Sequence, residues 1–231
     1  MRARPGVQAQ CYKTCNKVLE KWVQEIIADI LAIHAIGPAS YFAFNDFFAY
    51  MGAENTPSES HPAPAFRLQL MLKELKGMGY MNSQSEIDAV LSEALPRAEA
   101  DAKDVSYKKD EAANVVKETI QQNLTRILSE IRKFISAHSF NASAYADAVP
   151  KVLERLKDGI APIEVFDEHA GKMTPAPVVA ILNAGWELYK TDMAAFYGLF
   201  KPVVPKMERL GNLNQLIFKA VEASEIKRGW K

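Results

Sequence analysis

Residues 17–36, KVLEKWVQEIIADILAIHAI, decide the fold class of this chain. Apolar side chains recur there at spacings of three and four residues, which is the period of an α-helix. Toward its end the stretch is apolar on nearly all sides, as is typical of a helix buried in a core. Gly37 and Pro38 follow in the order that ends one helix and opens the next. We therefore expect a buried central helix with other helices packed around it.

Helical patterns continue along the rest of the 231 residues. No segment combines sustained period-two alternation with turn residues, so no strand is predicted. The expected fold is all-α, a single domain of about eight helices over residues 17–231, preceded by an irregular segment at 1–16. The charged stretch 96–110 lacks apolar periodicity and is expected to be a polar linker or the polar start of a helix. The further helices are predicted over 38–51, 66–78, 86–95, 112–137, 142–156, 177–189 and 213–227.

Composition excludes several classes of protein. The chain has 28 Lys plus Arg and 28 Asp plus Glu, whereas a nucleic-acid binder needs an excess of positive charge. Two cysteines cannot form a disulfide framework, so a cytoplasmic location is expected. The longest stretch without Asp, Glu, Lys or Arg, at 30–45, is shorter than a spanning helix of about 20 residues. A buried helix, a turn and a second helix are favoured there over a membrane-embedded hairpin.

Glu25 and Asp29 are the most informative polar residues of the first helix. They are four residues apart, so both carboxylates lie on one helix face and repel each other. Their neighbours are apolar, and an unpaired carboxylate is costly to bury. A metal ion, Lys, Arg or His is therefore expected opposite them. In the ordinary alternative Glu25 pairs with Lys21 and Asp29 with an Arg, and Arg67 competes with a metal as a bidentate partner.

Several motifs in this order resemble a group of bacterial zinc-metallopeptidase-like proteins of the gluzincin type. The resemblance covers most of residues 22–231 and is strongest over 22–72. Its motifs are Trp22-x-x-Glu25-x-x-x-Asp29, the apolar run up to Gly37-Pro38, the aromatic helix that follows, Ser60-His61-Pro62 with Arg67 and Leu68, and the later segments 180–186 and 213–226.

The resemblance implies roles for four residues. In gluzincins an H-E-x-x-H helix supplies two zinc ligands and a general base. A second helix supplies a Glu ligand, and an Asp one turn later orients a ligand histidine. By resemblance, Glu25 corresponds to the zinc ligand and Asp29 to the orienting carboxylate, with His61 and Arg67 supporting the site. Zinc is the implied cofactor, and three protein ligands would leave one position for water.

The chain departs from this family at the zinc helix itself. None of its histidines, His34, His61, His138 and His169, lies in an H-E-x-x-H or H-x-x-E-H motif. We therefore expect the helical C-terminal portion of a metallopeptidase-like hydrolase that is catalytically incomplete, with no catalytic residue of its own. Its expected partners are a missing N-terminal half or a second copy. The alternative is a non-enzymatic helical interaction or scaffold protein, in which both acids are paired with Arg or Lys.

The remaining candidate residues favour structural roles. Cys11 and Cys15 have no second cysteine pair downstream, so they are expected to be reduced bystanders. His61 lies between Ser60 and Pro62, which favours a role in building the loop over one as a free base. His34 is expected to be a core histidine. The aromatic series over 41–50 is expected to be mostly core, with a part that could drive self-association.

Overall fold

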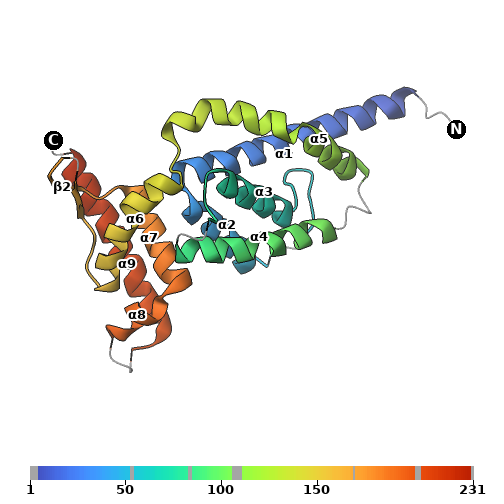
Figure 1. The fold of residues 1–231 in the computed structure, drawn as a ribbon. Coiled ribbons are helices and arrows are strands. Elements are labelled where there is room, and N and C mark those ends of the chain that lie inside the picture. Colours follow the sequence, from blue (N-terminus) through green and yellow to red (C-terminus); the bar gives the residue numbers. More distant parts are fainter. Residues whose placement is uncertain are drawn as a thin grey trace. The chain divides into compact units, whose positions relative to one another are not determined.

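The computed structural model describes residues 5–52, 55–82, 85–105, 111–168, 170–200 and 204–229. Within these ranges the chain forms nine α-helices, one 3₁₀ turn and a two-stranded hairpin, so the all-α prediction is confirmed (Figure 1). The elements are α1 (Pro5–Ile36), α2 (Pro38–Tyr50), α3 (Pro64–Gly77), α4 (Glu86–Asp104), α5 (Glu111–Ile135), η1 (Ser136–His138), α6 (Ala142–Lys157), β1 (Glu164–Asp167), β2 (Lys172–Pro175), α7 (Val178–Thr191), α8 (Met193–Gly198) and α9 (Lys206–Gly229).

The helices group into two compact units. The first unit contains residues 1–35, 40–76 and 93–139, and the second contains 36–39, 77–92 and 140–231. The sequence predicts one helical domain over 17–231. The structure divides the helices of this region between the two units.

The core of the first unit forms around α1, as the sequence predicts. Trp22, Ile26 and Ile30 are almost completely buried and pack with apolar residues of α3 and α5. The indole N–H of Trp22 donates a hydrogen bond of 2.9 Å to the carbonyl oxygen of Ser58. This bond ties the loop before α3 to the central helix, and that loop carries part of the candidate site.

Two of the predicted boundaries are wrong. The segment 1–16 was expected to be irregular, but α1 begins at Pro5, and Tyr12 on this extension is exposed. A stretch of helix that is exposed, as it is at Tyr12 and Lys13, needs no apolar stripe, so periodicity does not reveal it. The stretch 96–110 was expected to be a polar linker or the polar start of a new helix, but residues 96–104 continue α4 past Pro96. Ala98 and Ala102, four residues apart, form its buried face, and alanine combines high helix propensity with a weak apolar signal. Residues 106–110 lie outside the described ranges.

The second unit is built on α6, α7 and α9, with α7 packed against both of the others (Figure 1). Asn183 of α7 holds the turn between α1 and α2: its Oδ1 accepts from the N–H of Ala39 at 2.9 Å, and its Nδ2 donates to the carbonyl of Ile36 at 2.6 Å. Gly37 has a φ of +77°, and a Cβ there would lie 3.0 Å from Cδ1 of Phe140. The predicted stop at Gly37-Pro38 is confirmed, because only glycine fits both constraints.

A short antiparallel hairpin lies in the predicted loop 158–174. Strands β1 and β2 have four residues each, with Val165 opposite Thr174 and Phe166 opposite Met173. Such short strands, carrying several charged residues, show too little alternation to be recognised from sequence. The hairpin is held in the second unit by Lys227, whose Nζ lies 2.7 Å from Oε2 of Glu164, and by Ser224, which donates to the carbonyl of Ala176 at 2.5 Å.

Close packing of α7 on α9 depends on Gly185. A Cβ at this buried position would overlap with Cδ1 of Ile217. Gly185→Ala should therefore lower the free energy of unfolding by about 1–3 kcal/mol, as overpacking usually does. Urea denaturation measures this loss. Gly211→Ala in α9, where nothing lies within 4 Å, should instead be neutral or stabilise by up to about 1 kcal/mol. Adding Ile217→Val should restore most of the loss, and failure to do so would contradict the packing argument.

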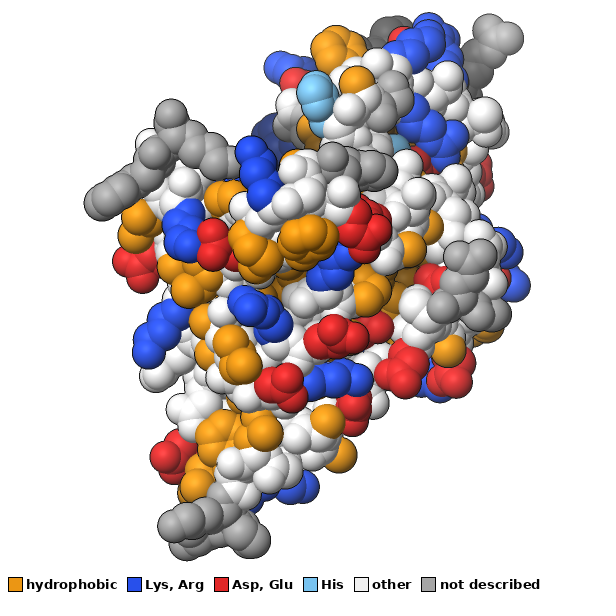
Figure 2. All heavy atoms as spheres, turned by 60° about the vertical axis from the view of Figure 1, so that its left-hand side comes forward, with side chains coloured by type: hydrophobic (Ala, Val, Ile, Leu, Met, Phe, Trp, Pro, Cys, Tyr) orange, Lys and Arg blue, Asp and Glu red, His pale blue; other side chains and the backbone are white. Residues whose placement is uncertain are grey.

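Charges of both signs are mixed on the surface. On the face drawn in Figure 2, Lys and Arg side chains alternate with Asp and Glu, in keeping with the zero net charge. Among the described helices, none has the length and apolar character needed to cross a bilayer.

Candidate functional site

Arg67 on α3 lies at the centre of the residues that the sequence singles out. Its Nε donates to Oδ2 of Asp29 and its Nη2 to Oδ1, both at 2.7 Å, which is a bidentate pair. Its Nη1 lies 2.9 Å from Oε2 of Glu25. One guanidinium therefore binds both carboxylates of α1, and we call these three residues the Arg67 cluster.

Burial sets the electrostatics of the Arg67 cluster. Asp29 and Arg67 are buried, whereas the Glu25 side chain remains 31% exposed. Desolvation is the strongest influence on Asp29 and raises the pKa of its carboxyl, while Arg67 acts in the opposite direction. Burial alone would lower the pKa of Arg67, but the hydrogen bond and charge of Asp29, together with Glu25, raise it. The ionised form of Asp29 therefore depends on Arg67.

Aromatic rings of α2 complete the surroundings of the guanidinium. The Cζ atom of Arg67 lies 5.4 Å from the ring centroid of Phe44 and 5.6 Å from that of Phe48. Contacts of this kind favour a cation that has lost part of its hydration. The aromatic helix predicted from sequence thus contributes directly to the pocket that holds Arg67.

His61 lies at the exposed edge of the Arg67 cluster. Its Nε2 is 3.5 Å from Oε1 of Glu25, and its side chain is 55% exposed. The loop itself is stabilised by Ser58, whose Oγ accepts from the backbone N–H of His61 at 3.0 Å, and Ser60 Oγ lies 2.8 Å from Nδ1 of His61. The structure thus brings together all four residues named from sequence, Glu25, Asp29, His61 and Arg67.

These residues do not fit a zinc site as they are arranged. Arg67 donors occupy both oxygens of Asp29 and one oxygen of Glu25, and the remaining Glu25 oxygen faces His61. In the part of the chain that the structure describes, no three His, Cys, Asp or Glu side chains are grouped as metal ligands. Of the partners considered from sequence, the structure shows the bidentate arginine on Asp29, and Arg67 together with His61 beside Glu25.

A second polar cluster in the first unit was missed by the sequence analysis. His34, expected to be a core histidine, is buried, and its Nε2 lies 2.8 Å from Oε1 of Glu74 on α3. Its Nδ1 lies 2.5 Å from Oγ of Ser139. Arg132 of α5 binds Glu74 with two hydrogen bonds of 2.8 and 2.6 Å. Glu74, a single acid within the apolar run of α3, was the available signal, although its partners His34 and Arg132 are 40 and 58 residues away in sequence.

The other candidates take no part in either cluster. Cys15 is half-buried and packs at the edge of the first core, and the side chain of Cys11 lies outside the described residues. His138 is exposed in η1. His169 lies outside the described residues.

Comparison with known proteins adds no family assignment. No protein-family model matches the chain, and neither a curated protein nor a solved structure is significantly similar to it.

Proposed function

We propose that this chain is a non-catalytic helical interaction protein rather than a metallopeptidase acting on its own. The observation that carries the proposal is the Arg67 cluster, in which one guanidinium satisfies both acids that could have held a metal. A cytoplasmic location belongs to the proposal, since two cysteines give no disulfide framework.

Electrostatics support a structural role for the Arg67 cluster. A zinc ion bound to Glu25 would have to displace or approach the Arg67 guanidinium, and like charges at such short range repel strongly where water is excluded. Displacing Arg67 would also take from the buried carboxylate of Asp29 the cation that binds both of its oxygens. The cluster therefore stabilises α1 against α3 instead of offering an open coordination position.

The end of α2 is the surface that supports an interaction role in the first unit. Phe47 and Met51 are more than half exposed and Tyr50 is 88% exposed. Exposed apolar side chains gathered at one place are typical of protein contact surfaces. Self-association through this end of α2 was expected from the aromatic series and remains part of the proposal.

The metallopeptidase-like function remains a second candidate because of one observation. Glu25 keeps part of its carboxylate accessible to solvent, and His61 Nε2 lies 3.5 Å from its free oxygen. A His and a Glu at this distance are two of the three protein ligands of many catalytic zinc sites. The third ligand would then have to come from another polypeptide.

Zinc analysis of the purified full chain separates the two candidates. The proposal predicts well below one zinc per chain after incubation with zinc and removal of the free ion, and no peptidase activity. Glu25→Gln and His61→Ala should leave this value unchanged, as should Glu59→Gln, a matched control on the exposed part of the same loop. One zinc per chain that is lost in Glu25→Gln and His61→Ala, but kept in Glu59→Gln, would overturn the proposal in favour of the second candidate.

A further inference from the structure

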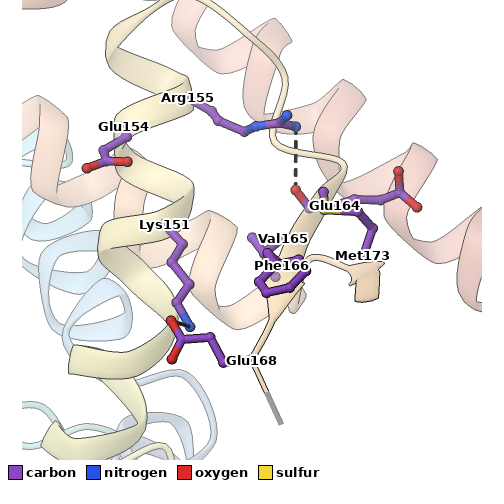
Figure 3. Close-up of a pocket in the computed structure, with 8 residues that line it drawn as sticks. All are labelled: Lys151, Glu154, Arg155, Glu164, Val165, Phe166, Glu168 and Met173. Atoms are coloured by element: carbon purple, nitrogen blue, oxygen red, sulfur yellow. Dashed lines mark hydrogen bonds and ion pairs between the residues drawn. The ribbon is translucent and has the colours of Figure 1, made fainter. Parts of the chain in front are cut away.

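A hollow of about 380 Å³ lies between α6 and the hairpin in the second unit. Figure 3 shows Lys151 and Arg155 reaching from α6 toward β1, with Phe166 and Met173 on the hairpin side. The volume lies within the range of typical ligand sites, which are about 300–1,000 Å³. Neither the Arg67 cluster nor the His34–Glu74 pair contributes to it.

The wall formed by β1 is an open strand edge. The N–H of Ala176 donates to the carbonyl of Ile163 at 2.9 Å, so this bond continues the ladder by one position beyond the ends of β1 and β2. In the observed register the pairs then alternate, and Glu164 and Phe166 occupy positions that do not exchange hydrogen bonds with β2. Their backbone N–H and C=O groups therefore point away from β2. The outward direction of the Glu164 carbonyl agrees with this, because it accepts from Nη1 of Arg155 on α6.

Among the described residues, few groups bind the backbone of this edge. The hydrogen bond from Arg155 to the carbonyl of Glu164 is long, at 3.4 Å, and within the described chain the backbone of Phe166 makes no hydrogen bond outside the ladder. An unpaired strand edge is a template for another strand, and peptide-binding domains use such edges to add one.

The α6 wall supplies positive charge. The guanidinium of Arg155 has a backbone carbonyl and no carboxylate as its recorded partner within the described chain. Lys151 lies one turn earlier on α6. Its Nζ is 3.1 Å from Oδ1 of Asp147 and, in a longer contact, 3.9 Å from Oε1 of Glu168.

The acids of the lining leave the charge of Arg155 available, but not that of Lys151. The carboxylate of Glu164 is paired with Lys227, Glu154 points away from the hairpin in Figure 3, and Glu168 lies beside Lys151. An arriving carboxylate would therefore find Arg155 able to bind it with two hydrogen bonds.

The floor of the hollow is apolar. Phe166 and Met173 face each other across the hairpin and are 52% and 47% exposed. Side chains of such a pair lie on one face of the sheet and approach closely. Together they offer a contact for an apolar side chain next to the cationic wall.

We propose that this hollow binds an extended acidic peptide as a third strand along β1. The peptide backbone bonds to the outward groups of Phe166, a carboxylate binds Arg155, and an apolar side chain covers Phe166 and Met173. The proposal rests on the interaction role proposed above and names the partner's chemistry: a segment in which Asp or Glu alternates with apolar residues.

The test begins with a random heptapeptide phage library selected on the full chain. The expected result is enrichment of sequences that alternate acidic and apolar residues. The most enriched peptide is then synthesised with a fluorescent label, and its Kd is measured by fluorescence anisotropy. Binding should weaken as salt is raised, because a charged contact contributes to it.

Variants of β1 separate backbone pairing from side-chain contact. Phe166→Ala removes the ring but keeps the outward N–H, whereas Phe166→Pro removes both and leaves the ladder bonds to β2 in place. Phe166→Pro should weaken binding by up to about tenfold more than Phe166→Ala, which is the effect of one lost hydrogen bond. An unchanged thermal melt shows that the hairpin remains folded.

Variants of Arg155 test the charge. Arg155→Glu should weaken binding at least about tenfold, while Arg155→Lys, which keeps the charge but not the bidentate geometry, should weaken it less. Arg97→Glu, a charge reversal on α4, is the matched control and should have no effect. The absence of any enriched peptide, or enriched peptides that bind Phe166→Pro and Arg155→Glu as well as the unchanged chain, would overturn the proposal. Zinc analysis is independent of these results, so a failure here leaves the proposed lack of metal chemistry standing.

Discussion

Arg67→Met should lower the free energy of unfolding by about 3–5 kcal/mol, which is the usual cost of leaving one member of a buried ion pair without its partner. Asp29 has a nearly fully buried carboxylate whose two oxygens both bind Arg67. Methionine keeps the apolar stem of the arginine side chain but lacks the guanidinium, so the contacts of Cζ with Phe44 and Phe48 are lost together with the ion pair. Urea denaturation of the two proteins at pH 7 measures the difference.

Two companion variants determine what the loss means. Arg97→Met removes an arginine whose side chain is 78% exposed and pairs with Glu93 on the same helix, so it should cost no more than about 0.5 kcal/mol. Arg67→Met combined with Asp29→Leu should recover most of the stability, because an apolar pair of similar volume often replaces a buried ion pair without loss. If Arg67→Met cost no more than Arg97→Met, Asp29 would not depend on Arg67 and the structural role of the cluster would be wrong.

The pH dependence of the Arg67→Met loss has a defined sign. Burial already raises the pKa of Asp29, and removing Arg67 removes the influences that lower it. A carboxyl whose pKa is higher in the folded state destabilises that state once it ionises, so the deficit is largest at neutral pH. It should shrink as the pH falls through the raised pKa of Asp29 and the proton neutralises the buried group.

The sequence analysis identified the residues of the Arg67 cluster, but it did not decide whether a metal ion or Arg67 binds the two acids. Two acids four residues apart on an apolar helix require a positive partner, and this requirement holds whatever the partner is. The choice between a metal and Arg67 depends on which side chain the fold brings opposite Asp29. That contact spans 38 residues, and helical periodicity carries no information about it.

The contrast between local patterns and contacts distant in sequence also explains which parts of the fold were predicted correctly. Strong local signals were reliable: the positive φ of Gly37 ends α1, and Ser85, a residue type that favours helix starts, caps α4 by accepting from the N–H of Asp88 at 3.2 Å. Weak signals failed where structure arises from contacts. Tyr12 and Lys13 of α1 are exposed and carry no apolar stripe, and the hairpin depends on bonds from Ser224 and Lys227 of α9, about 50 to 60 residues away in sequence.

Glu74→Gln should lower the free energy of unfolding at pH 7 by about 3 kcal/mol. Burial alone would raise the pKa of Glu74, but hydrogen bonds from Arg132 and His34 lower it to about 2. The ordinary value is 4.5, and each unit of difference corresponds to about 1.4 kcal/mol of stabilisation of the ionised, folded form. Glutamine keeps the shape of the side chain but carries no charge for Arg132 to bind.

The dependence on pH separates this charge effect from a packing effect. Because the folded pKa of Glu74 lies below the unfolded one, its contribution is complete above about pH 4.5 and is lost as the pH falls toward 2. The difference between the unchanged chain and Glu74→Gln should therefore be constant from pH 7 to pH 5 and decline below that. Glu99→Gln is the control, because Glu99 pairs with Lys73, the residue next to Glu74. Both side chains of this pair are more than one third exposed. Glu99→Gln should therefore change the free energy of unfolding little at any pH. A loss in Glu74→Gln that stayed the same down to pH 2 would come from packing, and the ion pair with Arg132 would then contribute nothing to holding α3 against α5.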